Sequence, residues 1–165
     1  MIAKSYIRRS LRFCQAKYSN AAGKMEALAF SKLAVLELCG WIEDSIDDIV
    51  LKCANRHLKS HKHTKFIKSQ VVERTYGFEY DRHFRAMLVH VFGLVVFERI
   101  EISIDPGRFQ KFKSALGELK VERDRQAHTY LKGVTIAVNA PSKTISLHAD
   151  VEAGLLDFER AIKAY

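Results

Sequence analysis

The sequence predicts an all-α protein, an antiparallel helical bundle with a long second helix and minor irregular or strand-like segments. Apolar residues recur at three- and four-residue steps over most of the chain, which is the period of an amphipathic helix. The chain has 2 Pro and 8 Gly, too few for an all-β protein rich in turns. Its 165 residues, 48% of them apolar, suffice for one ordinary core, so residues 1–165 are predicted to form a single domain.

The first half of the chain contains two predicted helices, over residues 2–18 and from 24 to about 60, joined by a turn at 20–23. Each helix has an apolar side, made of Ile7, Leu11 and Cys14 in the first and of Ile42, Ile46, Ile49, Val50 and Cys53 in the second. The opposite side of the second helix is acidic and carries Glu43, Asp44, Asp47 and Asp48. We interpret it as a solvated face rather than a metal site, with Asp48 and Lys52 forming an i,i+4 ion pair.

The middle of the chain predicts two further helices. A helix over 64–74 precedes a turn at Tyr76 and Gly77. The stretch 80–100 is the most apolar helix candidate and is expected to pack on the long helix as one element. Its polar residue His90 is expected to be a hydrogen-bonded core residue. The stretch 100–104 alternates like a short strand.

The last third begins with a clear helix start at Asp105 and Pro106, because Asp caps free backbone N–H groups and Pro fits the first turn. Gly117 is expected to end this helix or to let it pack closely. The remaining predictions are a helix opening with the segment 121–130, a strand-like piece at 134–138, a loop at 140–142 and a final helix from about 144 to 163.

The chain is basic, with 27 Lys and Arg against 19 Asp and Glu and a formal net charge of +8. A polyanion such as RNA is a reasonable partner, although a basic protein without such a partner fits equally well. RNA-backbone contacts are predicted for Arg8, Arg12, Lys52, Arg56, Lys59 and Lys62. For any single one of these residues, a solvated surface position remains the alternative.

Cysteine use and hydropathy predict the compartment. Cys14, Cys39 and Cys53 are odd in number and lack Cys-x-x-Cys spacing, which favours buried thiols in a reducing cytoplasm. The first residues lack the apolar core of a signal peptide. The longest apolar run, 86–97, is too short to span a bilayer. We therefore expect a soluble, cytoplasmic protein that does not bind a membrane.

One short segment carries residues suited to phosphodiester chemistry. Arg123 is followed after four residues by His128 and then by Tyr130. An arginine holds a phosphate through a permanently charged fork, and a histidine moves protons near neutral pH. The same Arg-x4-His spacing recurs at Arg56/His61 and Arg85/His90. The intervening residues at Arg123/His128 are mostly polar, and only there is a Tyr placed just beyond.

The spacing also constrains the geometry of such a site. Five residues on a regular helix turn about 140°, so Arg123 and His128 would not share a face, whereas Asp124 and His128 would. Either Arg123 lies at an irregular helix start, or the motifs of two subunits meet. Asp124 could then fix the tautomer of His128 and favour its charged form.

Arg123-Asp124-x-x-Ala127-His128-x-Tyr130 resembles the motif of the HEPN superfamily, small α-helical proteins with an RNase site at a homodimer interface. The resemblance implies a HEPN-like bundle and a metal-independent endoribonuclease, with no cofactor, in which Arg123 and His128 are catalytic. The family often has Asn where this chain has Asp124. A toxin or phage-defence role is implied, and the His-x-Tyr extension resembles toxins whose Tyr, here Tyr130, is nucleotidylated by a nucleotidyltransferase antitoxin.

Two functions of different classes follow from these observations. In the first, the protein cleaves RNA by attack of the 2′-hydroxyl, which needs no metal and leaves DNA intact. In the second, it is a non-catalytic helical module that binds nucleotide, RNA or a partner protein, and Asp124 merely pairs with Arg123 or Arg125. A third, weaker possibility is a structural protein in which residues 119–131 are a solvated helix.

Overall fold

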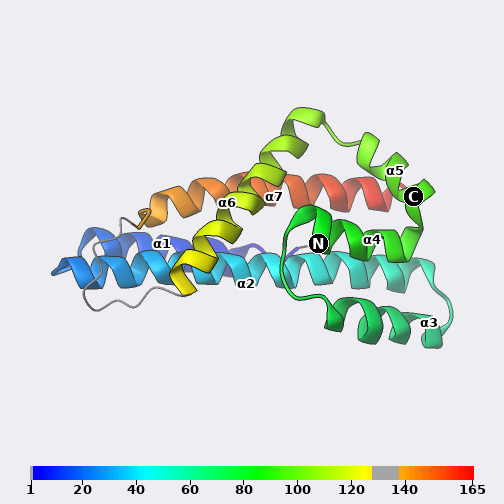
Figure 1. The fold of residues 1–165 in the computed structure, drawn as a ribbon, viewed down its shortest axis with the longest axis horizontal. Helices are drawn as coiled ribbons and strands as arrows, with labels where there is room; N and C mark the ends of the chain where they lie inside the picture. The colour runs from blue at the N-terminus through cyan, green and yellow to red at the C-terminus, as the bar shows by residue number, and fades with distance from the viewer. Residues whose placement is uncertain (1, 128–137) are drawn as a thin grey trace.

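The computed structural model describes residues 2–127 and 138–165 (Figure 1). Its α-helices are α1 (Ser5–Ser19), α2 (Lys24–His57), α3 (His61–Phe66), α4 (Arg85–Phe92), α5 (Leu94–Ile102), α6 (Pro106–Ala127) and α7 (Pro141–Lys163). Short π- and 3-10 segments, η1 (Ile67–Val71), η2 (Val72–Arg74) and η3 (Tyr80–Phe84), lie between α3 and α4. No strand occurs within the described ranges, so the all-α class and the long second helix are confirmed.

The long helix α2 is the element on which the others assemble (Figure 1). Helix α1 runs antiparallel to it and packs along its N-terminal half, whereas α7 contacts α2 while running in the same direction. Helix α6 crosses obliquely and contacts both α7 and α2. Helices α3 and α4 pack at the C-terminal end of α2. The end of α6 therefore lies across the middle part of α2.

The apolar faces predicted from the periodicity are the buried ones. Every residue of the two apolar sides is buried: Ile7, Leu11, Cys14, Ile42, Ile46, Ile49, Val50 and Cys53. The cysteines Cys14, Cys39 and Cys53 are free and buried, as expected. Asp48 and Lys52 form the predicted i,i+4 ion pair at 2.5 Å.

A cluster of aromatic rings joins α6, α7 and η3. Tyr80, Phe84, Phe112 and Phe158 meet mainly edge to face, with centroids 5.1–6.4 Å apart. Such contacts add to the free energy gained by burying the rings. Gly154 of α7 permits this close approach, because a Cβ there would lie 2.4 Å from the Phe112 ring.

The stretch 80–100 is not one helix, contrary to expectation. Gly93 adopts φ of +73°, a left-handed conformation that ends α4 and redirects the chain into α5. As a result Val95, which belongs to the stretch expected to pack on the long helix, is 68% exposed. His90 is exposed rather than buried, and its Nδ1 donates to the carbonyl oxygen of Ala86 at 2.8 Å. A glycine can pass through a left-handed turn at little cost, and here it breaks an otherwise continuous apolar pattern.

Two boundary predictions around 100–120 also need correction. The strand-like alternation at 100–104 is helical as far as Ile102, because three alternating residues are too few to outweigh the preceding helix. Gly117 neither ends α6 nor marks a close contact, since nothing lies within 4 Å of a Cβ built there. Leu116 and Leu119, both buried, continue the apolar side of α6 past it. The segment 121–127 consequently closes α6 instead of opening a new helix.

The helix start at Asp105 is confirmed, because its Oδ1 accepts the N–H of Arg108 at 2.8 Å. The final helix begins at Pro141, inside the predicted loop, since Pro fits the first helical position. The strand-like piece predicted at 134–138 falls outside the described residues except for Val138. None of the described helices combines the length and the apolar character that crossing a bilayer requires.

Candidate functional site

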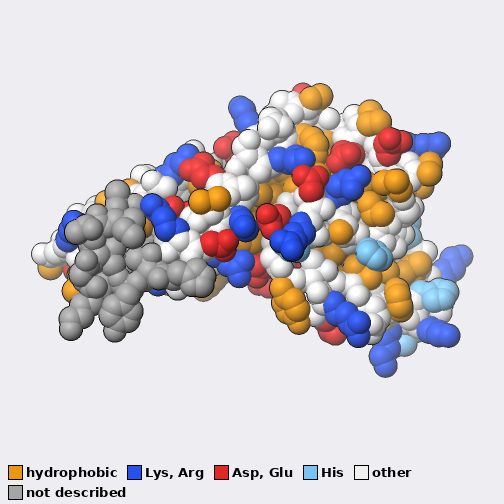
Figure 2. Space-filling model, viewed as in Figure 1, with side chains coloured by type: hydrophobic (Ala, Val, Ile, Leu, Met, Phe, Trp, Pro, Cys, Tyr) orange, Lys and Arg blue, Asp and Glu red, His pale blue; other side chains and the backbone are white. Residues whose placement is uncertain are grey.

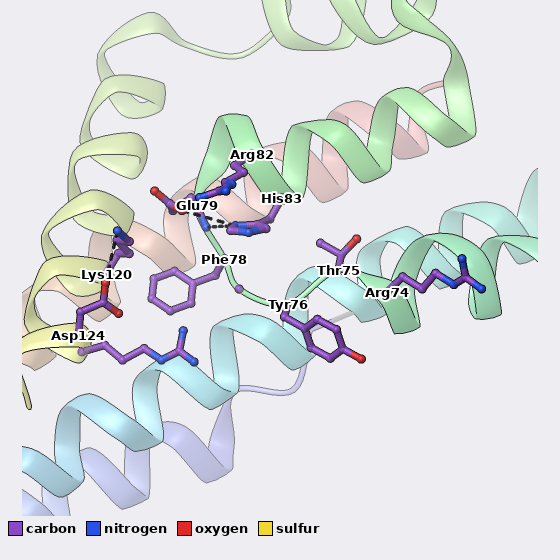
Figure 3. Close-up of a pocket in the computed structure, with 11 residues that line it drawn as sticks. Arg74, Thr75, Tyr76, Phe78, Glu79, Arg82, His83, Lys120 and Asp124 are labelled. Atoms are coloured by element: carbon purple, nitrogen blue, oxygen red, sulfur yellow. Dashed lines mark hydrogen bonds and ion pairs between the residues drawn. The ribbon is translucent and has the colours of Figure 1, made fainter. Parts of the chain in front are cut away.

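The motif residue Arg123 lines a cavity of about 550 Å³ that three segments enclose (Figure 3). The loop 74–79, which runs from the last residue of η2 to the start of η3, forms one wall. Arg82 and His83 of η3 form the second wall. The third wall is the last part of α6, which contributes Lys120, Arg123 and Asp124. We call this cavity the Arg123 pocket.

Arg123 is held in place from two sides. Its Nη1 lies 3.3 Å from Oε1 of Glu43 on α2, and its guanidinium lies over the ring of Phe78 at 5.8 Å from the ring centroid. Phe78 is itself 1% exposed, so the platform under the guanidinium is fixed in the core. Arg123 therefore presents a partly exposed, oriented charge instead of a freely moving one.

Arg123 lies inside the regular helix α6. One of the two arrangements considered for the motif, an irregular helix start at Arg123, is therefore excluded. Asp124 pairs with Lys120 across one helical turn at 3.3 Å, and Arg125 pairs with Glu122 at 2.5 Å. The partner that the structure shows for Asp124 is thus Lys120.

His83 is a pocket residue that the sequence interpretation missed. Its Nδ1 accepts the backbone N–H of Glu79 at 3.1 Å, which leaves Nε2 to carry the proton in the neutral ring. Burial lowers the pKa of His83, and the nearby Glu79 carboxylate offsets part of that shift. The lowered pKa favours the neutral ring of His83, in which Nε2–H is a donor. No sequence pattern links it to Arg123, because only the tertiary fold brings η3 beside α6.

The pocket is lined by four cationic side chains, Arg74, Arg82, Lys120 and Arg123, and by two acidic ones, Glu79 and Asp124. Within the described residues, neither Arg74 nor Arg82 takes part in an ion pair. The pocket thus has an excess of positive charge together with a neutral imidazole donor. Guanidinium groups bind phosphate oxygens through paired N–H donors, so the arrangement is suited to a phosphate diester or monoester.

The predicted partners His128 and Tyr130 lie outside the described residues. The six predicted RNA-binding residues are exposed, but none lines the Arg123 pocket. Lys52 and Arg56 line a separate hollow of about 340 Å³. Arg8 instead forms an ion pair with Glu152 of α7 at 2.7 Å. The structure therefore does not bring these six residues together with Arg123.

The surface charge is mixed rather than concentrated in one stripe. On the face shown in Figure 2, Lys and Arg side chains lie among acidic ones over the middle of the molecule. Basic side chains and histidines gather at the end that carries α3, where Lys59 and Lys62 are exposed. On this face no long stripe of basic side chains is visible.

The carboxylates on the acidic side of α2 lie close enough to one another to change the pKa of one of them. Burial, followed by the neighbouring Asp44, Glu43 and Asp48, raises the pKa of Asp47 to about 6. Across the part of the chain that is described, no three His, Cys, Asp or Glu side chains are placed to hold a metal ion.

No protein-family model matches the chain, and neither a curated protein nor a solved structure with significant similarity was found.

Proposed function

We propose that this protein is a metal-independent endoribonuclease that acts on RNA at a homodimer interface. The observation that supports the proposal best is the position of Arg123 in the Arg123 pocket, oriented by Glu43 and Phe78 among further cations. An arginine held in this way binds a phosphate without first losing side-chain freedom. The resemblance of the motif to HEPN RNases supplies the second residue, His128.

In the proposed reaction, Arg123 binds the scissile phosphate and stabilises the negative charge that builds on its oxygens in the transition state. His128 acts on the protons of the reaction. The 2′-hydroxyl loses its proton to a base and attacks phosphorus, while the bond to the 5′ oxygen breaks and that oxygen gains a proton. The products are a 2′,3′-cyclic phosphate and a 5′-hydroxyl end, so DNA is not a substrate.

The proposed homodimer would form along one side of α2. Along α2, one side of the helix carries Ala29, Leu33, Leu36, Gly40 and Glu43 at steps of four and three, and we call this side the seam. Its two large apolar residues are Leu33 and Leu36. Leu33 and Leu36 on this seam are 37% and 40% exposed. The seam ends at Glu43, the partner of Arg123. A second copy packed along it would therefore lie beside the Arg123 pocket, where the motifs of two subunits can meet.

The biological role that goes with this activity is a toxin or a phage-defence effector. The basis is the motif resemblance, which extends to Tyr130 as a target for a nucleotidyltransferase antitoxin. Adenylylation or a related modification of Tyr130 would place a charged group two residues after His128 and block the site. Intact mass of the protein, expressed with and without a candidate antitoxin, tests this part of the proposal.

A specific observation favours a second candidate, a non-catalytic module that binds a nucleotide or RNA phosphate. Both described charges of the motif are already engaged, Arg123 by Glu43 and Asp124 by Lys120. Charges that are paired within the protein serve packing and binding as readily as catalysis. In this case the Arg123 pocket would bind phosphate and no RNA would be cut.

The deciding experiment is RNA cleavage in EDTA by the wild type, Arg123→Ala and His128→Ala. The matched controls are Arg85→Ala and His90→Ala, because this pair has the same Arg-x4-His spacing outside the Arg123 pocket. We expect cleavage by the wild type and both controls and its loss in the two motif variants, with the fold intact by circular dichroism. Cleavage that needs a metal, or that survives in both motif variants, would refute the proposal.

Complementation tests whether two subunits build the site. Arg123→Ala and His128→Ala proteins are unfolded together and refolded as a mixture. If the site pairs Arg123 of one copy with His128 of the other, mixed dimers regain one intact site and cleave RNA. Leu36→Glu should yield monomers by light scattering, whereas Leu94→Glu, at a 58% exposed position of α5, should not. Full activity of a Leu36→Glu monomer would contradict the shared site.

A further inference from the structure

The loop 74–79 is anchored on both sides of a single exposed residue. Before that residue, Thr75 donates its N–H to the carbonyl oxygen of Val72 at 3.0 Å and its hydroxyl to that of Val71 at 2.7 Å. After it, Phe78 is buried to 1% exposure beneath Arg123. The loop backbone is therefore anchored on both sides of this residue.

Gly77 lets the loop lie close against His83. It adopts φ of +120°, which favours glycine, and a Cβ there would lie 2.8 Å from the His83 ring. The same ring accepts the N–H of Glu79 through its Nδ1. The loop thus passes directly over His83, and the wall that it forms for the Arg123 pocket is built against the core of the molecule.

The exposed residue between these anchors is Tyr76, which is 85% exposed, the highest value among the large apolar side chains of the described residues. Its ring makes no hydrogen bond or ring contact to any of those residues. It stands at the pocket between Thr75 and Phe78, with Arg74 on the adjoining turn (Figure 3). A large aromatic ring that stays exposed on a backbone anchored at both sides is open to a ligand, which is the arrangement of a binding platform.

We propose that Tyr76 is the base-binding platform of the Arg123 pocket: one unpaired nucleobase stacks on its ring while the adjacent phosphate binds Arg123. The proposal rests on the proposed function in one respect, that the ligand is RNA. The pairing of an aromatic face with a basic cavity is the arrangement by which proteins bind single strands. A base inside a duplex is stacked on both faces and cannot reach the ring, so the site selects unpaired nucleotides.

Stacking of this kind depends on a flat aromatic surface and little on which base is present. A Phe at position 76 should therefore stack with a base as Tyr does, whereas an Ala should not. The 2′-hydroxyl plays no part in stacking, so single-stranded DNA should occupy the platform even though it is not cleaved. Sequence preference at this position should be weak, and preference for unpaired over paired strands should be strong.

The test is binding, measured by fluorescence anisotropy with a labelled single-stranded 2′-O-methyl RNA, which cannot be cleaved by 2′-hydroxyl attack, and with its blunt duplex. The proteins are the wild type, Tyr76→Ala, Tyr76→Phe and Tyr6→Ala, the last a 63% exposed tyrosine on α1 outside the pocket. Tyr76→Ala should weaken single-strand binding roughly five- to a hundredfold, as expected for one lost base–aromatic stack. Tyr76→Phe and Tyr6→Ala should bind within about twofold of the wild type.

Oligonucleotides with one abasic position provide a second measurement. For the wild type, one such position should weaken binding markedly, and for Tyr76→Ala the same position should have no further effect. The proposal would be overturned if Tyr76→Ala bound the single strand as tightly as the wild type does. It would also be overturned if the substitution weakened duplex binding by the same factor as single-strand binding. If cleavage still depends on Arg123 and His128 in that event, the proposed RNase function stands without it. If stacking is found but no RNA is cut, the binding module is the function.

Discussion

Two clusters in this molecule bring a histidine with a lowered pKa together with glutamate and arginine, and they differ in their access to ligands. The closed cluster joins α1 and α7 through Lys4, Arg8, His148 and Glu152. The open cluster is the Arg123 pocket, with His83, Glu79, Glu43 and Arg123. The chemistry of the side chains is nearly the same in both, so their different surroundings decide their roles.

In the closed cluster the buried carboxylate ties two helices together. Glu152 is 7% exposed and receives hydrogen bonds from Arg8 at 2.7 and 3.3 Å. Burial alone would raise the pKa of Glu152, but the hydrogen bonds from Arg8 and Lys4 outweigh it and hold the pKa below its ordinary value. His148 lies 5.0 Å from the Trp41 ring, whose Nε1 donates to the carbonyl oxygen of Ala3 at 2.6 Å.

In the open cluster the same kinds of groups face a cavity. Among the described residues, no hydrogen bond engages the Nε2–H of neutral His83, and Arg123 is 39% exposed at its side chain. The comparison teaches that a lowered histidine pKa alone does not identify a functional site. Burial causes it in both clusters, and only the cavity beside His83 gives a ligand something to bind.

The largest expected difference between the clusters is in activity. Arg123→Ala should lower RNA cleavage by about 10²–10³-fold, because one group that stabilises the transition-state charge is lost. Its free energy of unfolding should change by less than about 1 kcal/mol, since the ion pair with Glu43 is partly exposed. Cleavage rate at saturating RNA and urea denaturation measure the two effects. If Arg123→Ala lost activity only because it unfolded, the open cluster would be structural like the closed one, and the contrast between the two clusters would fail.

The reverse pattern is expected for the closed cluster. Glu152→Ala should lower the free energy of unfolding by about 1–2 kcal/mol, because the charged hydrogen bonds that tie α1 to α7 are lost while Arg8 regains water. Cleavage per folded molecule should stay unchanged. Glu43→Ala is the matched control, a glutamate of the open cluster, and should cost less stability. Equal destabilisation by the two substitutions would argue against the contrast.

Lowering the pH should reveal the protonation of His148 in the closed cluster. Burial lowers the pKa of His148, although Glu152 acts against this and Arg8 and Lys4 reinforce it. The unfolded chain then binds this proton at a higher pH than the folded chain, so stability falls as the pH drops below about 6.5. Trp41 is the single tryptophan and reports the change, because a charged imidazole near its ring quenches fluorescence.

In this experiment, fluorescence of the folded wild type should decrease with a midpoint below the ordinary pKa of histidine. His148→Gln should abolish the transition, and His83→Gln should leave it in place because His83 makes no ring contact with Trp41. A transition that persists in His148→Gln would show that another group near Trp41 titrates.

The smallest effect is expected at the rim of the open cluster. Lys120 and Asp124 form an exposed i,i+4 pair, so Lys120→Ala should change the free energy of unfolding by about 0.5 kcal/mol or less. If Lys120 contacts a phosphate, the slope of log affinity against log salt concentration should fall in magnitude by about one. Binding of single-stranded oligonucleotide over a salt series measures it, with Lys111→Ala, an exposed lysine of α6 outside the Arg123 pocket, as the control.

Much of the fold was predictable from the sequence because the responsible interactions are local. The three- and four-residue spacing of Ile42, Ile46 and Ile49 specifies the buried side of α2 directly. Asp105 caps its helix within three residues of itself. The break at Gly93 was missed, since the left-handed turn is available to any glycine and is used only where the following helix can pack elsewhere.

The candidate site divides in the same way. The sequence alone singles out Arg123 and Asp124 by their spacing to His128 and Tyr130, and it determines the helical periodicity and the excess of basic residues. Only the tertiary structure brings the loop 74–79 and His83 to the end of α6, pairs Arg123 with Glu43 and leaves Tyr76 exposed. Helix formation depends on neighbours a few residues apart, whereas the Arg123 pocket depends on how α6 crosses α2. That crossing is set by the packing of side chains from several helices at once, so no single stretch of sequence encodes it.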